Sequence, residues 1–125
     1  MTVRLLAFAA SLRQASLNKR LIRVASDMAS ASGATVDLAE FREFDMPLLD
    51  QDLEEREGIP DGAKEFQRRL GQVDGLMIAS PEYNHSVPGT LTTLIDWLSR
   101  IRPVPLRGKS ALLLSTSRGL VGGNR

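Results

Sequence analysis

Apolar runs alternate with segments of helical period along the chain, and this alternation constrains the fold more than any other feature. Strands are expected at residues 3–10, 34–41, 75–80 and 110–116, and amphipathic helices at residues 18–32, 61–71 and 89–100. The run at 3–10 shows little polar alternation, as expected where both faces of a sheet are covered, whereas the shorter run at 34–41 alternates through Val36 and Leu38. The order of elements therefore predicts an α/β fold with a parallel sheet, right-handed crossovers and helices on both faces.

The predicted helices have apolar faces and recognisable ends. Gly33 lies where a glycine commonly ends a helix, and Asp61 is a plausible N-cap of the second helix. The acidic residues 42–60 are interpreted as a loop. The faces expected to be apolar consist of Leu17, Leu21, Val24, Ala25 and Met28 in the first helix and of Leu91, Leu94, Ile95 and Leu98 in the third.

The composition fits one globular domain and excludes several kinds of function. The chain has 125 residues, 42% of them hydrophobic, which favours a single domain at 1–125. A net charge of +1 gives no support for binding nucleic acid or a membrane surface. Cysteine is absent and His85 is the only histidine, so thiolate catalysis and Cys/His metal sites are excluded. Without a signal-peptide pattern or an apolar run of roughly 20 residues, a cytoplasmic location is expected.

The loop that follows the first predicted strand, residues 11–18, is rich in donors. In sheets of this kind ligands bind outside the carboxyl ends of the strands. Two serine hydroxyls, an amide and the guanidinium of Arg13 precede a helix, whose N-terminus attracts anions. This set favours binding of a single phosphate. The alternative is a helix cap in which Ser16 or Asn18 serves only the backbone.

Two further loops follow strands at the same edge. Residues 81–89 combine two prolines and a glycine with the only tyrosine and the only histidine, which suits the edge and face of a planar heteroaromatic ligand. Residues 116–123 contain three glycines, which allow the backbone to approach another group closely. Each of these features also has a simpler explanation. Tyr83 would be an ordinary half-buried aromatic, His85 a surface loop residue, and the glycines part of a flexible loop.

Taken together, these loops resemble the NADPH-dependent FMN reductase family, which includes flavodoxin-like azo-, quinone- and chromate-reducing enzymes. The most specific part is Pro-Glu-Tyr-Asn-His-Ser-Val-Pro-Gly at 81–89, followed by Leu-Ile-Asp-Trp at 94–97. Ser-Leu-Arg-x-x-Ser-x-Asn at 11–18 adds to it. The resemblance runs from the first strand to the end of the chain. It implies a flavodoxin-like sheet in the order 2-1-3-4, extended in the family by a fifth strand.

The resemblance also implies a cofactor and the residues that bind it. FMN would be the cofactor and NADPH or NADH the electron donor, with reduced flavin passing electrons to a quinone, azo compound, free flavin or metal oxyanion. Homodimers or homotetramers are common in the family, and Trp97 is a candidate for the subunit interface or for ordinary packing. The phosphate would be bound by Ser11, Arg13, Ser16 and Asn18, and the isoalloxazine by Pro81, Glu82, Tyr83, Asn84, Ser117 and Gly119.

The chain departs from the family pattern in three places. Ala10 replaces a usual glycine, and Thr92 and Thr93 replace a common lysine–asparagine pair. The family also continues through a helix, a fifth strand and a closing helix beyond the length of this sequence. Because residues 111–114 are apolar on both faces, we expect further polypeptide or a partner to cover them.

Other functions fit the residues less well. Gly108-Lys109-Ser110 resembles the end of a phosphate-binding P-loop, but it precedes a strand, and Pro103 stands where that motif needs glycine. The dinucleotide fingerprint, the acidic residues of a receiver domain and the serine-hydrolase elbow are missing. A divalent-cation site at Asp50, Asp52, Glu54 and Glu55 is less favoured than a solvated loop. A non-enzymatic electron carrier or flavin-binding regulatory module is the alternative to an enzyme.

Overall fold

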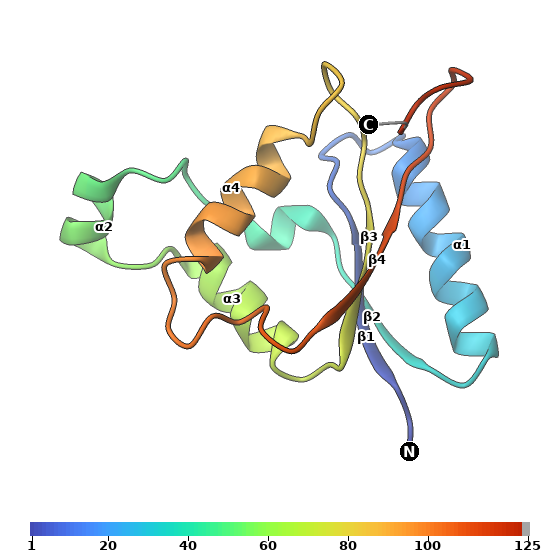
Figure 1. Ribbon diagram of the computed structural model, residues 1–125, viewed down its shortest axis with the longest axis horizontal. Coiled ribbons are helices and arrows are strands. Elements are labelled where there is room, and N and C mark those ends of the chain that lie inside the picture. The colour runs from blue at the N-terminus through green and yellow to red at the C-terminus, as the bar shows by residue number, and fades with distance from the viewer. Residues whose placement is uncertain (124–125) are drawn as a thin grey trace.

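The computed structural model describes residues 1–123 and contains one parallel sheet (Figure 1). Its strands are β1 (Arg4–Ala9), β2 (Thr35–Leu38), β3 (Gly75–Ala79) and β4 (Ser110–Leu114), in the order β2-β1-β3-β4. The register pairs Leu5 with Val36, Ala7 with Met77 and Ile78 with Leu113. The predicted α/β class, the strand order and the parallel pairing are therefore confirmed.

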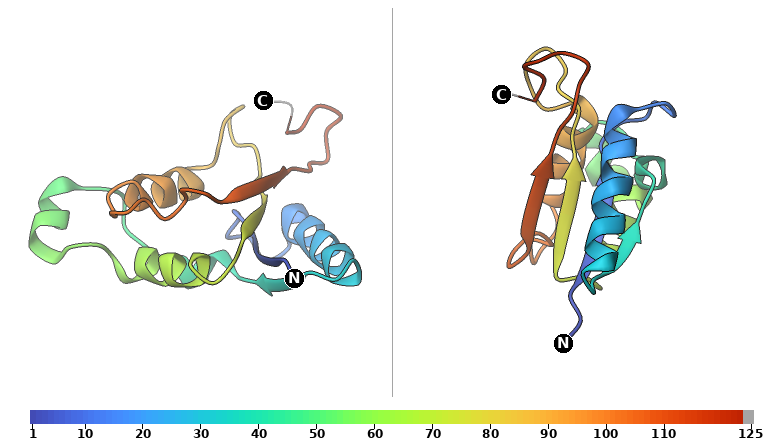
Figure 2. Two further views of the ribbon diagram at one scale, coloured as in Figure 1. Left: turned by 60° about the horizontal axis from the view of Figure 1, so that its bottom comes forward. Right: turned by 90° about the vertical axis from the view of Figure 1, so that its right-hand side faces the viewer.

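Helices cover the two faces of the sheet unequally (Figure 2). Helix α1 (Leu17–Ala31) lies on one face, whereas α3 (Asp61–Leu70), α4 (Gly89–Leu98) and the 3₁₀ turn η1 (Phe41–Phe44) lie on the other. The short helix α2 (Gln51–Glu57) projects away from the sheet beyond α4 (Figure 1). None of the helices formed by residues 1–123 is long and apolar enough to cross a lipid bilayer.

Residues 42–60 are not simply the acidic loop expected from the sequence. The side chains of Phe41 and Phe44, the first and last residues of η1, are buried. Asp50 caps α2 by accepting from the amides of Asp52 and Leu53. Both elements are too short to give a periodic signal, which explains the missed assignment. The expectation that Asp61 is an N-cap is also wrong, because Pro60 occupies the cap position and Asp61 is the first residue of α3.

The core beneath α3 and α4 is built around phenylalanine. The ring of Phe8 on β1 lies 5.5 Å from that of Phe41 and 5.6 Å from that of Phe66, between centroids. Phe44 and Phe66 meet edge to face at 5.0 Å, a geometry that adds to the stabilisation from area burial. Four aromatic side chains from three segments thus join β1, η1 and α3 into one packed unit.

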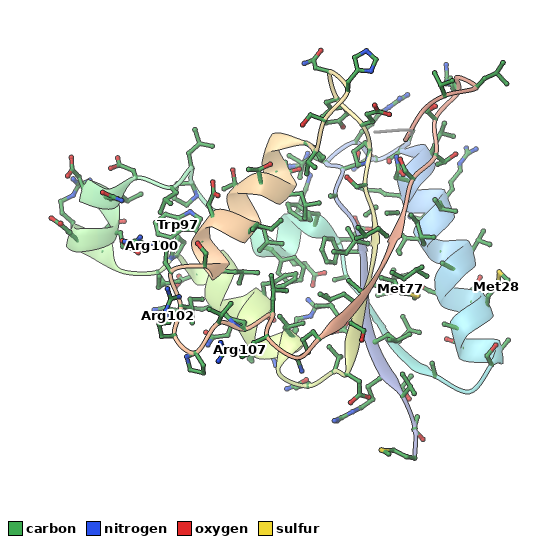
Figure 3. The ribbon with its side chains drawn as sticks, in the orientation of Figure 1. Met28, Met77, Trp97, Arg100, Arg102 and Arg107 are labelled. Atoms are coloured by element: carbon green, nitrogen blue, oxygen red, sulfur yellow. The ribbon has the colours of Figure 1, made fainter. Side chains whose placement is uncertain are left out.

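The face occupied by α1 is built from smaller side chains. Ile22 packs on Ala7, Ala9 and Ala79, but Val24 and Met28 are 56% and 67% exposed. Figure 3 shows Met28 on the far side of α1 from Met77, which lies in the sheet. Because the apolar side chains spread around much of the helix, periodicity alone did not show which stripe would meet the sheet. The inclusion of Val24 and Met28 in the buried face is therefore wrong.

The buried face of helix α4 includes Trp97 and not Ile95, which the sequence placed on that face. Ile95 is 46% exposed, whereas Leu91, Leu94 and Leu98 are buried as expected. Trp97 is fully buried and its indole Nε1 donates to the carbonyl of Pro47 at 2.7 Å. Packing, rather than a place at the surface, is the role that this structure gives to Trp97.

Two contacts hold residues 45–60, here called the arm, against α4. One is the bond from Trp97 to Pro47; the other is a bidentate pair between Arg100 and Glu54, with bonds of 2.6 and 2.9 Å. Figure 3 shows Trp97 and Arg100 near each other on the side of α4 that faces α2. The hydrogen bonds from Arg100 hold the pKa of Glu54 below its ordinary value. The arm is therefore attached through its polar groups as well as its apolar ones.

A second arginine joins three elements at the opposite side of the core. Arg69 on α3 donates to both carboxylate oxygens of Asp37 on β2 at 2.7 and 2.9 Å, and to Glu43 at 3.1 Å. These bonds, first those to Asp37, raise the pKa of Arg69 above its ordinary value. Bidentate geometry of this kind fixes orientation as well as adding electrostatic attraction.

The strand β4 forms the edge of the sheet and is exposed on both faces. Leu112 and Leu113 point to opposite faces and are 51% and 71% exposed. Lys109, just before the strand, donates to the carbonyl of Val73 at 2.6 Å and fixes the amino end of the edge. The sequence expectation that this run should be covered on both sides stays a prediction.

Candidate functional site

Three loops meet beyond the carboxyl ends of the strands, at the upper edge of the sheet in Figure 1. They are residues 10–16 after β1, residues 80–88 after β3 and residues 115–123 after β4. The amide of Ala10 donates to the carbonyl of Ala79, and that of Ser80 to the carbonyl of Leu114, so the strand ends remain aligned as the loops begin. The structure thus brings all three sequence-predicted loops to one edge.

The first loop presents buried hydroxyls beside a helix N-terminus. Ser11 and Ser16 are only 4% and 6% exposed, whereas Arg13 is exposed. Ser16 is the N-cap of α1, and its Oγ accepts from the amide of Lys19 at 3.3 Å. Ser16 is therefore a helix cap, but one cap leaves other first-turn amides directed outward. Its hydroxyl hydrogen also remains a possible donor, because the cap uses only the oxygen.

Asn18 is placed differently from the other residues predicted to bind phosphate. Its side chain is buried, its Nδ2 donates to the carbonyl of Thr116 at 3.3 Å, and its Oδ1 accepts from the amide of Thr116 at 3.2 Å. The two residues are 98 positions apart. The structure therefore gives the Asn18 amide a defined protein partner, on the loop that follows β4.

The second loop forms a tight hairpin above the sheet. Tyr83 and Ser86 exchange two backbone hydrogen bonds of 3.1 Å, and Asn84 and His85 between them have φ of 53° and 61°. This is the backbone of a two-residue hairpin turn, for which glycine or asparagine is the favoured choice. A histidine in the left-handed region costs roughly 1–2 kcal/mol. The side chain of Tyr83 is 51% exposed, which agrees with the half-buried aromatic alternative as well as with stacking.

Glu82 ties this hairpin to the third loop. Its carboxylate accepts from the amide of Gly123 at 2.5 Å and lies 3.6 Å from the Nδ1 of His85. Ser115 donates from its Oγ to the carbonyl of Ser80 at 2.7 Å. Between the two loops lies a cavity of about 300 Å³, lined partly by Glu82 and Ser86. Sequence reasoning did not predict these cross-loop bonds, because no local pattern identifies their partners.

The glycines of the third loop have different roles. A Cβ on Gly122 would lie 1.6 Å from Ser117 Oγ, and one on Gly123 would lie 2.7 Å from Ser115, so both glycines are needed for the loop to fold back on itself. At Gly119 the nearest atom would be 3.8 Å away, an ordinary contact. The Gly119 amide donates to Ser117 Oγ at 3.1 Å. The loop itself therefore explains why residues 122 and 123 are glycines, without close approach to a ligand.

A larger cavity, of about 480 Å³, opens beside the first loop. Its wall includes Leu12 from that loop, Phe41 from η1, Met46 from the arm, and Thr90 from α4. Arg42 donates from its guanidinium to the carbonyl of Leu12 at 3.2 Å, and Thr90 donates to the carbonyl of Ala10 at 3.2 Å. The backbone of the first loop is therefore held from this side by two side chains that sequence reasoning did not single out.

The acidic residues considered for a cation lie elsewhere. Glu54 is paired with Arg100, and Asp50 caps α2. Across residues 1–123 no three histidine, aspartate or glutamate side chains are grouped closely enough to hold a metal ion.

The chain is similar in sequence to known flavin and quinone reductases. The family model described as NADPH-dependent FMN reductase matches residues 3–125. The chain is 41% identical over 115 residues to a quinone reductase of Escherichia coli, covering 92% of this chain and 60% of that protein. It is 32% identical to an NAD(P)H-dependent FMN reductase of Pseudomonas aeruginosa, over 96% of this chain and 63% of that protein. It therefore spans about three fifths of the length of these relatives.

A solved structure of similar fold comes from Paracoccus denitrificans. The flavoenzyme NAD(P)H:(acceptor) oxidoreductase FerB superposes with a TM-score of 0.80 at 27% sequence identity, over 96% of this chain and 64% of that one. The sequence match covers all three loops of the candidate site, and the structural match covers nearly all of the fold. The chain belongs to the NADPH-dependent FMN reductase family.

Proposed function

We propose that this chain carries the FMN site of an oxidoreductase that uses NADPH or NADH to reduce bound flavin and then reduces a second acceptor. The acceptor would be a quinone, azo compound, free flavin or metal oxyanion. The observation that supports this most directly is the meeting of the three loops at one edge of a parallel sheet, in a chain of this family.

The first loop fits a phosphate group. Ser11 and Ser16 supply hydroxyls, Arg13 supplies a full positive charge, and the first turn of α1 supplies amides with the positive end of the helix dipole. A dianion at this position would have charge-assisted bonds without a deeply buried cation, since Arg13 is exposed. Asn18 would contribute through the N–H that does not bond to Thr116.

The other two loops fit a planar ring. Backbone groups of Pro81, Glu82 and Asn84, the half-exposed ring of Tyr83, and Ser117 and Gly119 would surround it. Bound FMN supplies hydride and single-electron chemistry. The chain itself binds and orients the group, excludes water on one side and sets the local electrostatics. This division of roles requires no general acid or base, and we assign no catalytic residue.

The first test is titration of FMN into the 125-residue protein, followed by quenching of flavin fluorescence. Saturable binding is expected, and Arg13→Ala should weaken it by about tenfold or more, because a charge-assisted hydrogen bond contributes roughly 1.5–3 kcal/mol. Equal affinity in wild type and variant would contradict the assignment of the first loop to the phosphate.

A second test separates an enzyme from an electron carrier. NADPH oxidation is followed spectrophotometrically in the presence of a soluble quinone, with and without added FMN. An enzyme gives turnover that depends on FMN, whereas a carrier or regulatory module binds FMN without sustained NADPH oxidation. The near-neutral charge of the chain favours the enzyme, because flavodoxin-type carriers are usually acidic.

We further propose that residues 1–123 belong to a single flavin-binding domain whose β4 edge is covered by additional polypeptide. The exposure of Leu112 and Leu113 supports this proposal, as does the greater length of the relatives. Assembly into a homodimer or homotetramer and a cytoplasmic location stay predictions.

A further inference from the structure

Asn18 is the buried polar side chain through which two distant loops of the candidate site are joined. It lies in the first turn of α1, two residues after the N-cap Ser16, and is 4% exposed. Its amide makes a reciprocal pair of bonds with the backbone of Thr116, one in each direction, at 3.3 and 3.2 Å. A side-chain amide can satisfy a backbone N–H and C=O together in this way only if its plane is fixed.

The hydrogen bonds between Asn18 and Thr116 matter for the candidate site because of where Thr116 lies. Thr116 lies two residues after the end of β4 and directly before Ser117, whose hydroxyl exchanges bonds with the backbone of Gly119. A displacement of Thr116 is therefore transmitted to Ser117 and Gly119. On the other side, Asn18 is part of the helical turn that presents the donors of the first loop.

The remaining contacts between the loops do not replace this pair. Ser115 bonds to the carbonyl of Ser80, and Glu82 bonds to the amide of Gly123, so both of these contacts connect the third loop to the second loop. The bonds of Asn18 connect the third loop to the first. Within residues 1–123, a side-chain hydrogen bond from α1 to the loop after β4 is made by Asn18 alone.

We propose that Asn18 is a positioning residue that sets the distance between the phosphate-binding loop and the Thr116–Gly119 backbone, and thereby the fit of the flavin ring. The expected effect on flavin binding rests on the proposed FMN function. The pair of hydrogen bonds between Asn18 and Thr116, here called the clamp, is a property of the ligand-free protein. The positioning role of Asn18 goes beyond direct contact with phosphate, because a phosphate contact alone would not involve the ring.

The clamp is tested first without any ligand. Hydrogen–deuterium exchange at the Thr116 amide is compared in wild type and Asn18→Ala, with Gln72→Ala as control. Gln72 carries the same kind of side chain, exposed at the opposite end of the sheet. We expect exchange at Thr116 to rise about tenfold or more in Asn18→Ala and to be unchanged in the control, because the Oδ1 of Asn18 is the acceptor of that amide among residues 1–123. Unchanged exchange in Asn18→Ala would overturn the proposal.

The positioning role is tested with FMN and with riboflavin, which has the same ring and no phosphate. Asn18→Ala should weaken riboflavin by about tenfold, as expected for the loss of two hydrogen bonds in a part-buried site, and should weaken FMN by at least as much, because FMN also loses the Asn18 N–H to its phosphate. Arg13→Ala should weaken FMN alone. A loss confined to FMN in Asn18→Ala would reduce Asn18 to a phosphate ligand and overturn the positioning role.

Asn18→Asp guards against a folding defect. The aspartate has nearly the same shape and still accepts from Thr116 N–H, but its second oxygen faces the Thr116 carbonyl in place of a donor, so riboflavin affinity should fall as it does in Asn18→Ala. The melting temperatures of both variants are measured alongside, to verify that each is folded at the temperature of the titration. Riboflavin affinity equal to wild type in Asn18→Asp and Asn18→Ala would also contradict the proposal. If wild type binds neither flavin, the proposed function fails, whereas exchange at Thr116 still decides whether the clamp exists.

Discussion

The two faces of the sheet differ in how completely they are packed. Beneath α3 and α4, Phe8, Phe44 and Phe66 are at most 1% exposed and pack ring against ring. On the α1 face the buried sheet residues are three alanines and Met77, while Met28 and Leu112 are more than half exposed. The aromatic face contains most of the large buried side chains, so we expect it to account for most of the stability. The α1 face has apolar surface left for further contacts.

The largest effect is expected in the aromatic cluster. Phe66→Ala removes a ring that packs on Phe8 and Phe44, and should lower the free energy of unfolding by about 3–5 kcal/mol. Met28→Ala, the matched change on the α1 face, should alter it by less than about 0.5 kcal/mol. Urea unfolding followed by circular dichroism measures both values. Similar losses in the two variants would show that the two faces contribute equally.

A smaller effect is expected where the arm is attached to the aromatic face. Trp97→Phe keeps an aromatic ring but removes the donor to the Pro47 carbonyl, which should cost about 1–3 kcal/mol. Limited proteolysis should cleave residues 45–60 faster in this variant than in wild type. Loss of stability without faster cleavage would mean that the bond supports the core and does not hold the arm.

The exposed edge should tolerate a charge. Leu112→Lys should change the free energy of unfolding by less than about 0.5 kcal/mol, because the side chain is half exposed. The same change should reduce self-association in light scattering, since a lysine on an edge strand opposes pairing with another strand. A loss of several kcal/mol would show that this face is more tightly packed than its exposure indicates.

The smallest effect concerns pH and the arm. Because Arg100 lowers the pKa of Glu54 in the folded chain, this pair stabilises the fold above the ordinary glutamate pKa, and the contribution is lost as pH falls through the lowered value. Cleavage of residues 45–60 by an acid-active protease should rise over that range. Glu54→Gln should remove this rise, and an unaltered acid dependence in Glu54→Gln would assign it to another carboxylate. Solvent exposure keeps the effect modest.

Much of the fold could be predicted because its signals are local. The helix end at Gly33 needed only a residue that tolerates positive φ, which is 101° in the structure. Three strands were recognisable by continuous apolar runs, the second strand by the alternation of Val36 and Leu38, and the helices by their period. By contrast, η1 and α2 were missed because elements of 4 and 7 residues have too few turns to show a period.

The candidate site was predictable in location and only partly in detail. The sequence indicated that three loops would lie at one edge, because the carboxyl ends of parallel strands all lie at the same edge. It could not indicate that Asn18 bonds to Thr116, or that Glu82 bonds to the amide of Gly123. These partners are backbone atoms, which every residue carries, so no residue type identifies them.

By itself, the sequence determined the order of strands and helices, the family and the loops that form the site, since each depends on short-range patterns and residue types. Tertiary structure alone decided which stripe of α1 meets the sheet, that Trp97 is buried against the arm, and that Asn18 joins two loops. The physical reason is that backbone conformation follows local sterics and hydrogen bonding. The choice of partner depends on which groups are brought together once distant segments have packed.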